Sequence, residues 1–335
     1  MTRFGILGFG LHAVRRLMPG FAQSKRCHVT ALSRRDIGSA QASAKQFNIP
    51  WAFGSAEDLC RCDEVDAILV TTPNSCHLQD VLLALKNGKP VLCEKPMGMN
   101  AEECRQMVEA AQQAGLLLGV AQVFRFENST AKLRARIAGG EVGTPVFARS
   151  EFSYPGREHP RKWLTDAKLS GGGPIADVGV HCIDALRYVL QDEVVGVTAR
   201  GYADQDSGDV EAAAVLALRF AQGTLGSVMV STRVEYRTPM EIVGDKGTLC
   251  GNDVLNVERP IQLHRIEGGK AVETEEVTNY EAYARQVDAF AAALEDRVPF
   301  PVPGEEGWKN QIILDAAYRS LRSGKTEKIP GLGKV

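Results

Sequence analysis

Three side chains of this sequence have the chemistry to move protons at a carbonyl group. Lys95 lies in the segment Val91–Pro96, and Asp177 and His181 follow the glycines at 171–173. A lysine can hold the negative charge that develops on a reacting oxygen, a histidine exchanges protons near neutral pH, and an aspartate can orient a substrate or tune the histidine. We therefore expect a catalytic set of Lys95, Asp177 and His181. The alternative is a surface ion pair and a core histidine.

Local spacing supports this expectation. Asp177 and His181 are four residues apart, which places them on one face of an α-helix. The glycine run at 171–173 lets the backbone approach a ligand closely.

A glycine motif near the start predicts a dinucleotide site. Gly8 allows a tight turn after a strand, Gly10 leaves room for a pyrophosphate, and Ala13 lets the next helix pack closely. An apolar strand precedes the motif and an apolar helix follows it, which is the context that the motif requires. The expected cofactor contacts here are Gly8, Gly10, Leu11, His12 and Ala13. The alternative is a chance glycine-rich turn.

The end of the second expected strand bears on the choice of dinucleotide. NAD sites usually carry an acid there, whereas this chain has Ser33, Arg34 and Arg35. A hydroxyl and guanidinium groups suit a 2′-phosphate, so we expect NADP, with Ser33 and Arg34 as contacts and NAD as the alternative. Asp36 lies too late in the chain and is expected to form a turn or a helix cap. The two arginines could also be a solvated surface.

Polar residues after two later strands are expected to reach the same ligand. In an open parallel sheet, ligands lie outside the carboxyl ends of the strands. The expected contacts are Thr72, Pro73, Asn74 and His77 after the strand that begins at Asp66, and Glu94 and Lys95 after the strand at 90–93. The alternative for Asn74 and Ser75 is that they cap the next helix.

The elements that must position these residues fall into two groups. The first 121 residues alternate between strands that are apolar along their length and helices, which predicts a parallel sheet covered on both faces. Strands are expected at 3–7, 28–33, 66–72, 90–93 and 116–121, and helices over 11–21, 39–47, 75–87 and 101–114. This is an α/β fold with an N-terminal Rossmann, doubly wound parallel sheet.

The pattern changes near residue 122. A series of strands separated by turns then predicts a large, mostly antiparallel open sheet in an α+β domain. Strands are expected at 146–152, 194–202, 210–219, 224–231, 239–243 and 260–266, with helices over 129–138, 175–190, 280–295 and 304–323. The expected domains are 1–122, which binds the dinucleotide, and 123–335, which binds substrate and forms the oligomer.

Composition restricts the class of protein. The chain has 335 residues, a net charge of −2 and 24% charged residues, which argues against nucleic acid or a membrane surface as the main partner. It contains no apolar run of membrane-spanning length, and its start reads as a strand rather than a signal peptide. The eight cysteines are scattered, so we expect reduced thiols, no metal site and a cytoplasmic location.

Taken together, these motifs resemble one family. The matching segments are Gly8–Ala13, Thr72–Asn74 with His77, Glu94–Pro96, Gly171–Gly173 with Asp177, His181 and Asp184, Ile242–Leu249, and Tyr283–Phe290. The resemblance is to the glucose–fructose oxidoreductase, inositol dehydrogenase and rhizopine-catabolism (Gfo/Idh/MocA) family. It implies NAD(P)-linked oxidoreduction of sugars or polyols, and a C-terminal sheet that forms dimer or tetramer contacts. Lys95, Asp177 and His181 occupy the family's catalytic positions. Ser33, Arg34 and the stretch 181–190 are most similar to sugar reductases of the 1,5-anhydro-D-fructose reductase type.

Some positions depart from the family pattern and bear on the substrate. The segment 122–128 keeps Arg125 but lacks the usual proline, and Trp163 is followed by leucine instead of arginine. The expected substrate contacts are Arg125, Trp163 and Tyr283, with Trp163 stacking on a sugar face or lying in the core. A basic loop, formed by Arg157, His159, Arg161 and Lys162, could receive an acidic or phosphorylated substrate or could be a solvated surface.

The sequence therefore predicts an oxidoreductase that prefers NADP and acts on a sugar or sugar-derived carbonyl or hydroxyl. The alternatives are an NAD(P)-linked diol or inositol-type dehydrogenase, and a cofactor-binding regulator without turnover. The expected partners are a small-molecule substrate and further copies of the chain, as a homodimer or homotetramer. The apolar stretches 212–218 and 225–230 suggest a face buried between subunits.

Overall fold

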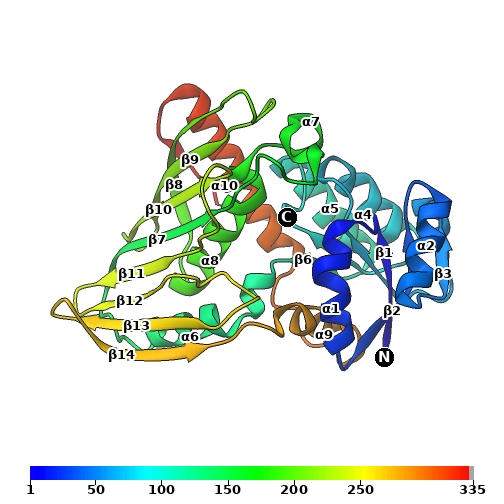
Figure 1. Cartoon of the computed structure of the whole chain (residues 1–335), viewed down its shortest axis with the longest axis horizontal. Helices are drawn as coiled ribbons and strands as arrows, with labels where there is room; N and C mark the ends of the chain where they lie inside the picture. The colour runs from blue at the N-terminus through cyan, green and yellow to red at the C-terminus, as the bar shows by residue number, and fades with distance from the viewer. Residues whose placement is uncertain (332–335) are drawn as a thin grey trace. The chain divides into compact units, whose positions relative to one another are not determined.

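The computed structural model describes residues 1–331 and shows two compact units (Figure 1). The first unit comprises Met1–Val123 and Glu281–Lys309, and the second comprises Phe124–Tyr280 and the chain from Asn310 onward. The described residues contain no helix that is long and apolar enough to cross a membrane.

The first unit is built on a six-stranded parallel sheet. Its strands are β1 (Thr2–Leu7), β2 (Cys27–Ser33), β3 (Trp51–Phe53), β4 (Ala67–Val70), β5 (Val91–Glu94) and β6 (Leu118–Ala121). They lie in the order β3-β2-β1-β4-β5-β6, which is the order of a dinucleotide-binding Rossmann fold. Every residue of β4, β5 and β6 is buried, as expected for strands that are covered on both faces.

Helices connect these strands. They are η1 (Ala13–Leu17), α1 (Met18–Gln23), α2 (Ile37–Phe47), α3 (Ala56–Cys60), η2 (Asn74–Cys76), α4 (His77–Lys86) and α5 (Ala101–Ala114). Short pieces β3 and α3 were not predicted, since three to five residues carry too little periodicity.

The first unit also includes residues that the expected domain division placed in the second. Helix α9 (Ala282–Glu295) packs on α1, and its Phe290 ring lies 5.8 Å from the Phe4 ring of β1. Gly20 makes this approach possible, because a Cβ there would lie 2.6 Å from the Cβ of Tyr283. After residue 280 the chain therefore returns to the first unit and packs against its N-terminal part.

The second unit is built on a nine-stranded mixed sheet. Its strands are β7 (Pro145–Ser153), β8 (Val194–Tyr202), β9 (Ala213–Phe220), β10 (Leu225–Ser231), β11 (Met240–Gly244), β12 (Thr248–Gly251), β13 (Ile261–Glu267), β14 (Lys270–Val277) and β15 (Glu327–Lys328). Their order is β14-β13-β12-β11-β7-β10-β9-β8-β15, and β7–β10 is the only parallel strand pair in the described part of this sheet. The predicted fold class is thus confirmed, and β12, β14 and β15 are strands that the sequence did not predict.

Helical segments complete this unit. They are η3 (Val123–Phe126), which begins one residue before it, α6 (Asn128–Ala138), η4 (Lys162–Thr165), α7 (Ala167–Ser170), η5 (Ile175–Gly179), α8 (Val180–Leu190) and the later part of α10 (Gly304–Ser323).

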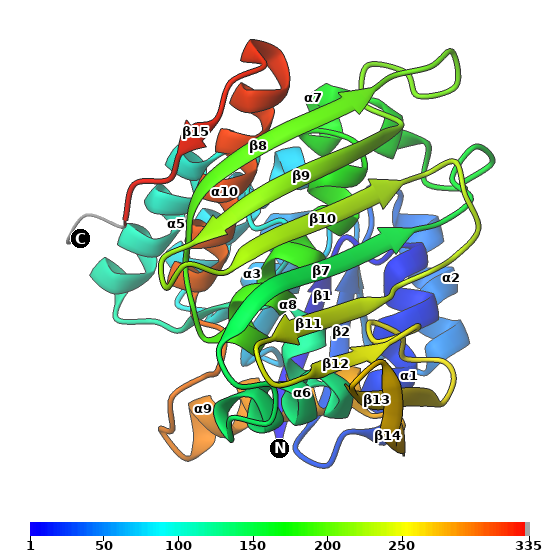
Figure 2. The ribbon, with the colours of Figure 1, turned by 90° about the vertical axis from the view of Figure 1, so that its left-hand side faces the viewer.

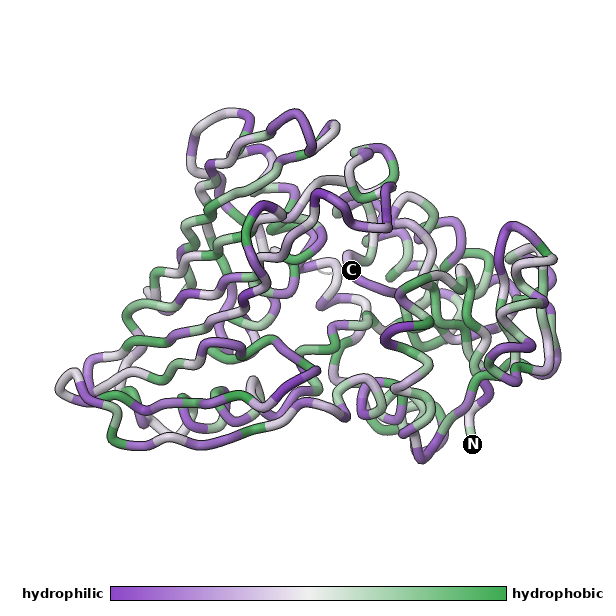
Figure 3. The backbone as a smooth tube through the Cα atoms, viewed as in Figure 1, coloured by the Kyte–Doolittle hydropathy of each residue, from purple (hydrophilic) through white to green (hydrophobic). Residues whose placement is uncertain are grey.

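One face of this sheet packs on helices and the other is open. Figure 2 shows β7 to β10 at the front with α8 behind them. Leu216 and Val228 point inward and are buried, whereas Phe147, Val215 and Leu225 are about half exposed. Buried and more exposed residues therefore alternate along β9 and β10, although both strands are mostly hydrophobic (Figure 3).

Candidate active site

The turn after β1 has the form that a bound pyrophosphate requires. Gly8 has φ +85°, and a Cβ there would lie 2.8 Å from the backbone nitrogen of Thr72, so only glycine fits. A Cβ on Gly10 would meet only the carbonyl oxygen of Gly8, at 3.6 Å. Open space above a glycine at the start of a helix is what a close approach of phosphate needs.

The helix after this turn is irregular. Residues 13–17 form the π-helix η1, and α1 follows with Pro19 in its first turn. The sequence predicted a regular α-helix there, because its apolar spacing does not distinguish one wide turn from the α-helical period. Single π turns recur at functional sites, and this one lies directly after the glycine motif.

Four predicted site residues of the first unit lie together. Nε2 of His12 lies 2.9 Å from Oε1 of Glu94, and the His12 ring meets the Tyr283 ring edge-on at 6.1 Å. The backbone nitrogen of Lys95 donates to Oε2 of Glu94 over 3.2 Å. Burial acts to raise the pKa of Glu94, but the attraction of His12 and Lys95 outweighs it, so this pKa lies below its ordinary value.

The end of β2 presents Arg34 to solvent. Nη1 of Arg34 donates to Oγ of Ser43 over 2.9 Å, while Ser33 is buried. Asp36 accepts a hydrogen bond of 2.6 Å from the backbone nitrogen of Ser39 and begins α2, so its predicted role as a helix cap is confirmed. That carboxylate is occupied by the cap, which leaves Ser33 and Arg34 as the side chains at the strand end.

The loop after β4 is held by His77. The side chain is fully buried, with Nε2 2.9 Å from the carbonyl oxygen of Thr72 and Nδ1 3.0 Å from that of Pro96. Burial lowers the pKa of His77. This geometry joins the loops after β4 and β5. Asn74, also buried, begins η2, and Pro73 precedes it.

In the second unit, Asp177 meets a residue that sequence reasoning missed. The hydroxyl of Tyr154, just after β7, donates to Oδ2 of Asp177 over 2.8 Å. Burial and the neighbouring Asp177 raise the pKa of Tyr154, so its hydroxyl stays protonated and is the donor. Nη2 of Arg161 lies 3.9 Å from the same oxygen.

The segment that carries Asp177 and His181 differs from the predicted single helix. Residues 175–179 form the π-helix η5, and α8 begins at Val180. The predicted helix over 175–190 is therefore one π turn followed by an α-helix, and the shared face of Asp177 and His181 stays a prediction. His181 is buried between aromatic rings, 4.5 Å from the Phe124 ring and 5.9 Å from the Phe152 ring.

The glycine run before η5 accommodates a buried acid and a tyrosine. A Cβ on Gly172 would lie 1.8 Å from the hydroxyl of Tyr318, and one on Gly173 would lie 2.3 Å from the backbone oxygen of Glu211. The carboxylate of Glu211 accepts from the nitrogens of Gly173 (3.1 Å) and Ile175 (2.8 Å), and from the Tyr318 hydroxyl (3.1 Å).

Glu211 therefore caps the helix that carries Asp177 and His181. Burial raises the pKa of Glu211 although these hydrogen bonds act to lower it. Sequence reasoning missed Glu211. The signal available in the sequence was a single acidic residue at the start of an otherwise apolar segment that was predicted as a strand.

Arg125 is held by Asp184. Its Nε and Nη2 donate to the two carboxylate oxygens over 2.9 and 2.7 Å; the Asp184 side chain is buried, and the Arg125 side chain is 9% exposed. Nδ2 of Asn310 also donates to Asp184, over 2.8 Å. This paired geometry joins η3, α8 and α10.

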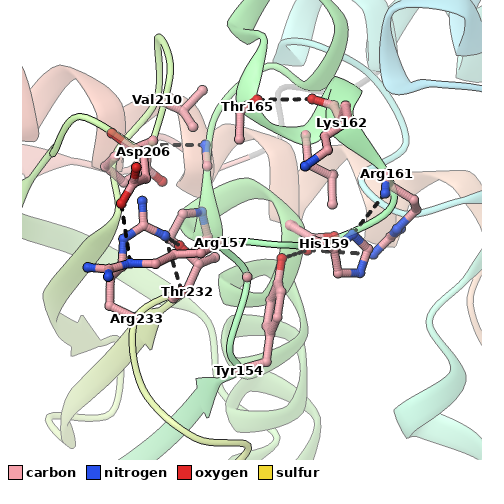
Figure 4. A pocket seen from close by; sticks show the side chains of 17 residues that line it. Tyr154, Arg157, His159, Arg161, Lys162, Thr165, Asp206, Val210, Thr232 and Arg233 are labelled. Carbon is pink, nitrogen blue, oxygen red and sulfur yellow. Dashed lines mark hydrogen bonds and ion pairs between the residues drawn. The ribbon is translucent and has the colours of Figure 1, made fainter.

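A pocket opens beside Asp177 (Figure 4). It has a volume of about 120 Å³ and lies between the loop at 156–165, the start of η5 and the loop at 206–211. Asp177, Tyr154 and Glu211 line it together with the basic loop. Trp163 is half-buried on the same loop but does not line the pocket; its ring lies 5.9 Å from the Arg161 guanidinium carbon.

Neither a metal-binding cluster nor a disulfide is found in the described part of the chain. Within residues 1–331, no group of three or more His, Cys, Asp or Glu side chains could hold a metal ion. All eight cysteines are free, and burial raises the pKa of Cys60 and of Cys182 to about 12.

The fold and these sites define a Rossmann-type dinucleotide-binding protein with a second, sheet-based unit. Comparison with known families gives the same result. Residues 2–122 match the oxidoreductase family with an NAD-binding Rossmann fold, and residues 130–250 match the GFO/IDH/MocA C-terminal domain. The chain belongs to the Gfo/Idh/MocA family and is an oxidoreductase.

Named relatives are dehydrogenases and reductases of sugars and polyols. A 1,5-anhydro-D-fructose reductase of Ensifer adhaerens is 30% identical over 334 residues, covering 98% of this chain and 99% of that protein. A D-xylose 1-dehydrogenase (NADP(+)) of Haloferax volcanii is 30% identical over 325 residues, covering 96% and 98%. The structure of an aldose-aldose oxidoreductase from Caulobacter crescentus with glycerol shares the fold, with a TM-score of 0.90 at 24% identity and coverage of 98% and 99%.

Proposed function

We propose that this enzyme interconverts a carbonyl and a hydroxyl group of a sugar-derived substrate, with NADP preferred, and that Lys95, Asp177 and His181 carry the chemistry. The observation that supports this most directly is the hydrogen bond between Tyr154 and Asp177 on the wall of a pocket. It holds a carboxyl group where substrate hydroxyl groups can reach it.

Each residue has a distinct role in this proposal. Lys95 donates to the reacting oxygen and stabilises its negative charge. His181 exchanges the proton of that oxygen with its imidazole, and the surrounding rings of Phe124 and Phe152 exclude water from it. Asp177 binds substrate hydroxyls. The nicotinamide dinucleotide, when bound, supplies or accepts the hydride.

The first unit is proposed to bind the dinucleotide. Gly8, Gly10, Leu11, His12 and Ala13 receive the pyrophosphate, and Ser33 with Arg34 bind the 2′-phosphate of NADP. The missing acid after β2 and the exposed guanidinium of Arg34 support NADP over NAD. The Haloferax relative is also named for NADP.

Two predicted contacts, His77 and Arg125, receive more limited roles. Thr72 and Asn74 stay cofactor contacts in this proposal, whereas His77 acts by holding their loop, because both of its ring nitrogens face backbone carbonyls. Arg125 acts through its pair with Asp184, which fixes the start of the second unit against α8.

Two predicted substrate residues belong to different parts of the chain. Tyr283 lies beside His12 in the first unit, so we propose that it contacts the cofactor side of the site. Trp163 would reach a substrate only by a change in its loop, since it does not line the pocket.

We also propose a cytoplasmic homodimer or homotetramer. The eight free, scattered cysteines support the location. The half-exposed Phe147, Val215 and Leu225 on the open face of the sheet support assembly of copies through this face.

The test is oxidation of NADPH and NADH with a panel of ketoses, aldoses and osones, followed by reduction of NADP and NAD with sugars, diols and inositols. We expect turnover of sugar carbonyls with NADPH, and its loss in the His181→Ala variant. A preference for diols would favour the second candidate, which is supported by a mouse trans-1,2-dihydrobenzene-1,2-diol dehydrogenase that is 33% identical over 250 residues, covering 73% of each protein. Tight cofactor binding with no turnover of any compound would contradict both.

A further inference from the structure

The pocket beside Asp177 is unusually basic for a site that would hold a neutral sugar. Its basic lining residues are Arg157, His159, Arg161, Lys162 and Arg233. All of them belong to the second unit, and Figure 4 shows them around one space, with Tyr154 below them. What the pocket can bind depends on which of these cations are already paired with acidic side chains.

Two of these cations are neutralised at the edge of the pocket. Arg233 donates through Nε and Nη2 to both carboxylate oxygens of Asp204, over 2.6 and 2.7 Å. Nε of Arg157 lies 3.4 Å from Oδ2 of Asp206. These pairs use Asp204 and Asp206.

The remaining two acids of the lining are committed elsewhere. Glu211 accepts from two backbone nitrogens and from Tyr318, so its charge is directed at the start of η5. Asp177 accepts from Tyr154 at 2.8 Å, whereas Arg161 reaches the same oxygen only at 3.9 Å. Arg161 therefore has a weak partner, and its planar group keeps donors for a further acceptor.

Lys162 is the cation that nothing balances. Within residues 1–331 its ammonium group makes no ion pair and no side-chain hydrogen bond, and its side chain points toward the pocket in Figure 4. The side chain is exposed, so the charge is hydrated and costs little in the free protein. An ammonium group and a guanidinium group on adjacent residues form a ready site for an anion.

We propose that Lys162 and Arg161 bind an anionic group of the substrate, a carboxylate or a phosphate ester, while Asp177 binds hydroxyls of the same molecule. The substrate class is then a sugar acid or a sugar phosphate. This inference rests on the proposed function, because it assigns the pocket to the substrate.

The experiment compares three compounds that share one ring and differ at one carbon: glucose, glucuronate and glucose 6-phosphate. Turnover and calorimetric binding are measured for the wild type, for Lys162→Ala and for Lys168→Ala. Lys168 lies nearby in the chain, in α7, is exposed and does not line the pocket, so its replacement removes an equal charge outside the site.

We expect kcat/KM of the wild type to be at least tenfold higher for one of the two anions than for glucose, and to fall as KCl rises. The ratio of anion to glucose should drop about tenfold in Lys162→Ala and stay within twofold in Lys168→Ala. The comparison of glucuronate with glucose 6-phosphate shows whether the site prefers a carboxylate or a phosphate ester.

Other results overturn the inference or separate it from the proposed function. The anion site would be refuted if kcat/KM for glucose equals or exceeds that for both anions and if Lys162→Ala leaves the ratio of anion to glucose unchanged. The oxidoreductase proposal would still stand. If no compound is turned over, binding decides: binding of an anion that requires Lys162 supports the site even though the proposed reaction fails. Absence of such binding refutes it.

Discussion

The hydroxyl of Tyr154 donates a hydrogen bond of 2.8 Å to Oδ2 of Asp177. The two residues are 23 positions apart, one at the end of a strand and one in a π-helix, and both line the pocket. Tyr154 therefore restricts the orientation of the Asp177 carboxyl group on the wall of the pocket.

Tyr154→Phe should weaken catalysis without weakening cofactor binding. The loss of a hydrogen bond to a charged group costs about 1.5–3 kcal/mol, which corresponds to about a tenfold or greater drop in kcat/KM. Steady-state kinetics with the best substrate measure this drop, most of it in KM if Asp177 mainly holds hydroxyls. NADPH titration is the control. An unchanged kcat/KM would show that the Tyr154 contact is only structural.

Arg34→Ala should weaken NADPH binding by roughly tenfold or more and leave NADH binding nearly unchanged, because only NADPH carries the 2′-phosphate. Fluorescence titration of both cofactors measures the effect. Arg35→Ala removes the neighbouring charge and should have a smaller effect. An equal loss for the two cofactors would remove Arg34 from the phosphate site.

Lys95→Ala and His181→Ala should each lower kcat strongly, since proton transfer by a placed side chain contributes about 10²–10⁴ in rate. Their effects should not add in the double variant, because both groups serve one transition state. Single and double variants are compared by steady-state kinetics, with NADPH affinity within a few-fold as the control. Fully multiplicative losses would mean that the two groups act in separate steps.

Glu127→Gln should change the pH dependence of stability. Glu127 is fully buried, its Oε1 has no hydrogen-bond partner within residues 1–331, and burial raises its pKa well above the ordinary value. A raised folded-state pKa gives stability that is present below the unfolded pKa of about 4.5 and is lost as pH rises toward the folded pKa. The wild type should therefore lose melting temperature relative to Glu127→Gln between pH 5 and 8.

Melting curves measured at intervals of one pH unit test this prediction. Glu258→Gln, which changes an exposed glutamate in the same way, serves as the control. A constant difference between wild type and Glu127→Gln across the range would show that Glu127 does not titrate in this window.

Phe147→Arg with Leu225→Arg should convert the proposed oligomer to monomers. The two residues are neighbours across the β7–β10 pair, and both are half exposed on the open face. Two buried charges without partners would destabilise an interface there. Light scattering at micromolar concentration measures the mass, and Val298→Arg, at another exposed apolar position, is the control. A wild type that is monomeric would refute assembly through this face.

The sequence by itself determined the parts of this protein that depend on local pattern. Strands such as β4 and β5 follow from runs of apolar residues, and helix α10 begins and ends where its periodicity predicts. Gly8 follows from the need for a positive φ at a tight turn, and Asp36 from the preference of acids for helix starts. Local rules are enough in these cases because the interactions span only a few residues.

Only the tertiary structure decided what surrounds the site residues. The carboxylate of Glu211 caps a helix 36 residues earlier, and Asn310 donates to Asp184 across 126 residues. Both π-helices arise in segments whose residue spacing also fits an α-helix. Such features depend on close packing and hydrogen bonding between distant segments, which have no period along the chain. The physical reason is that a buried polar group must find a partner in space, whichever part of the sequence supplies it.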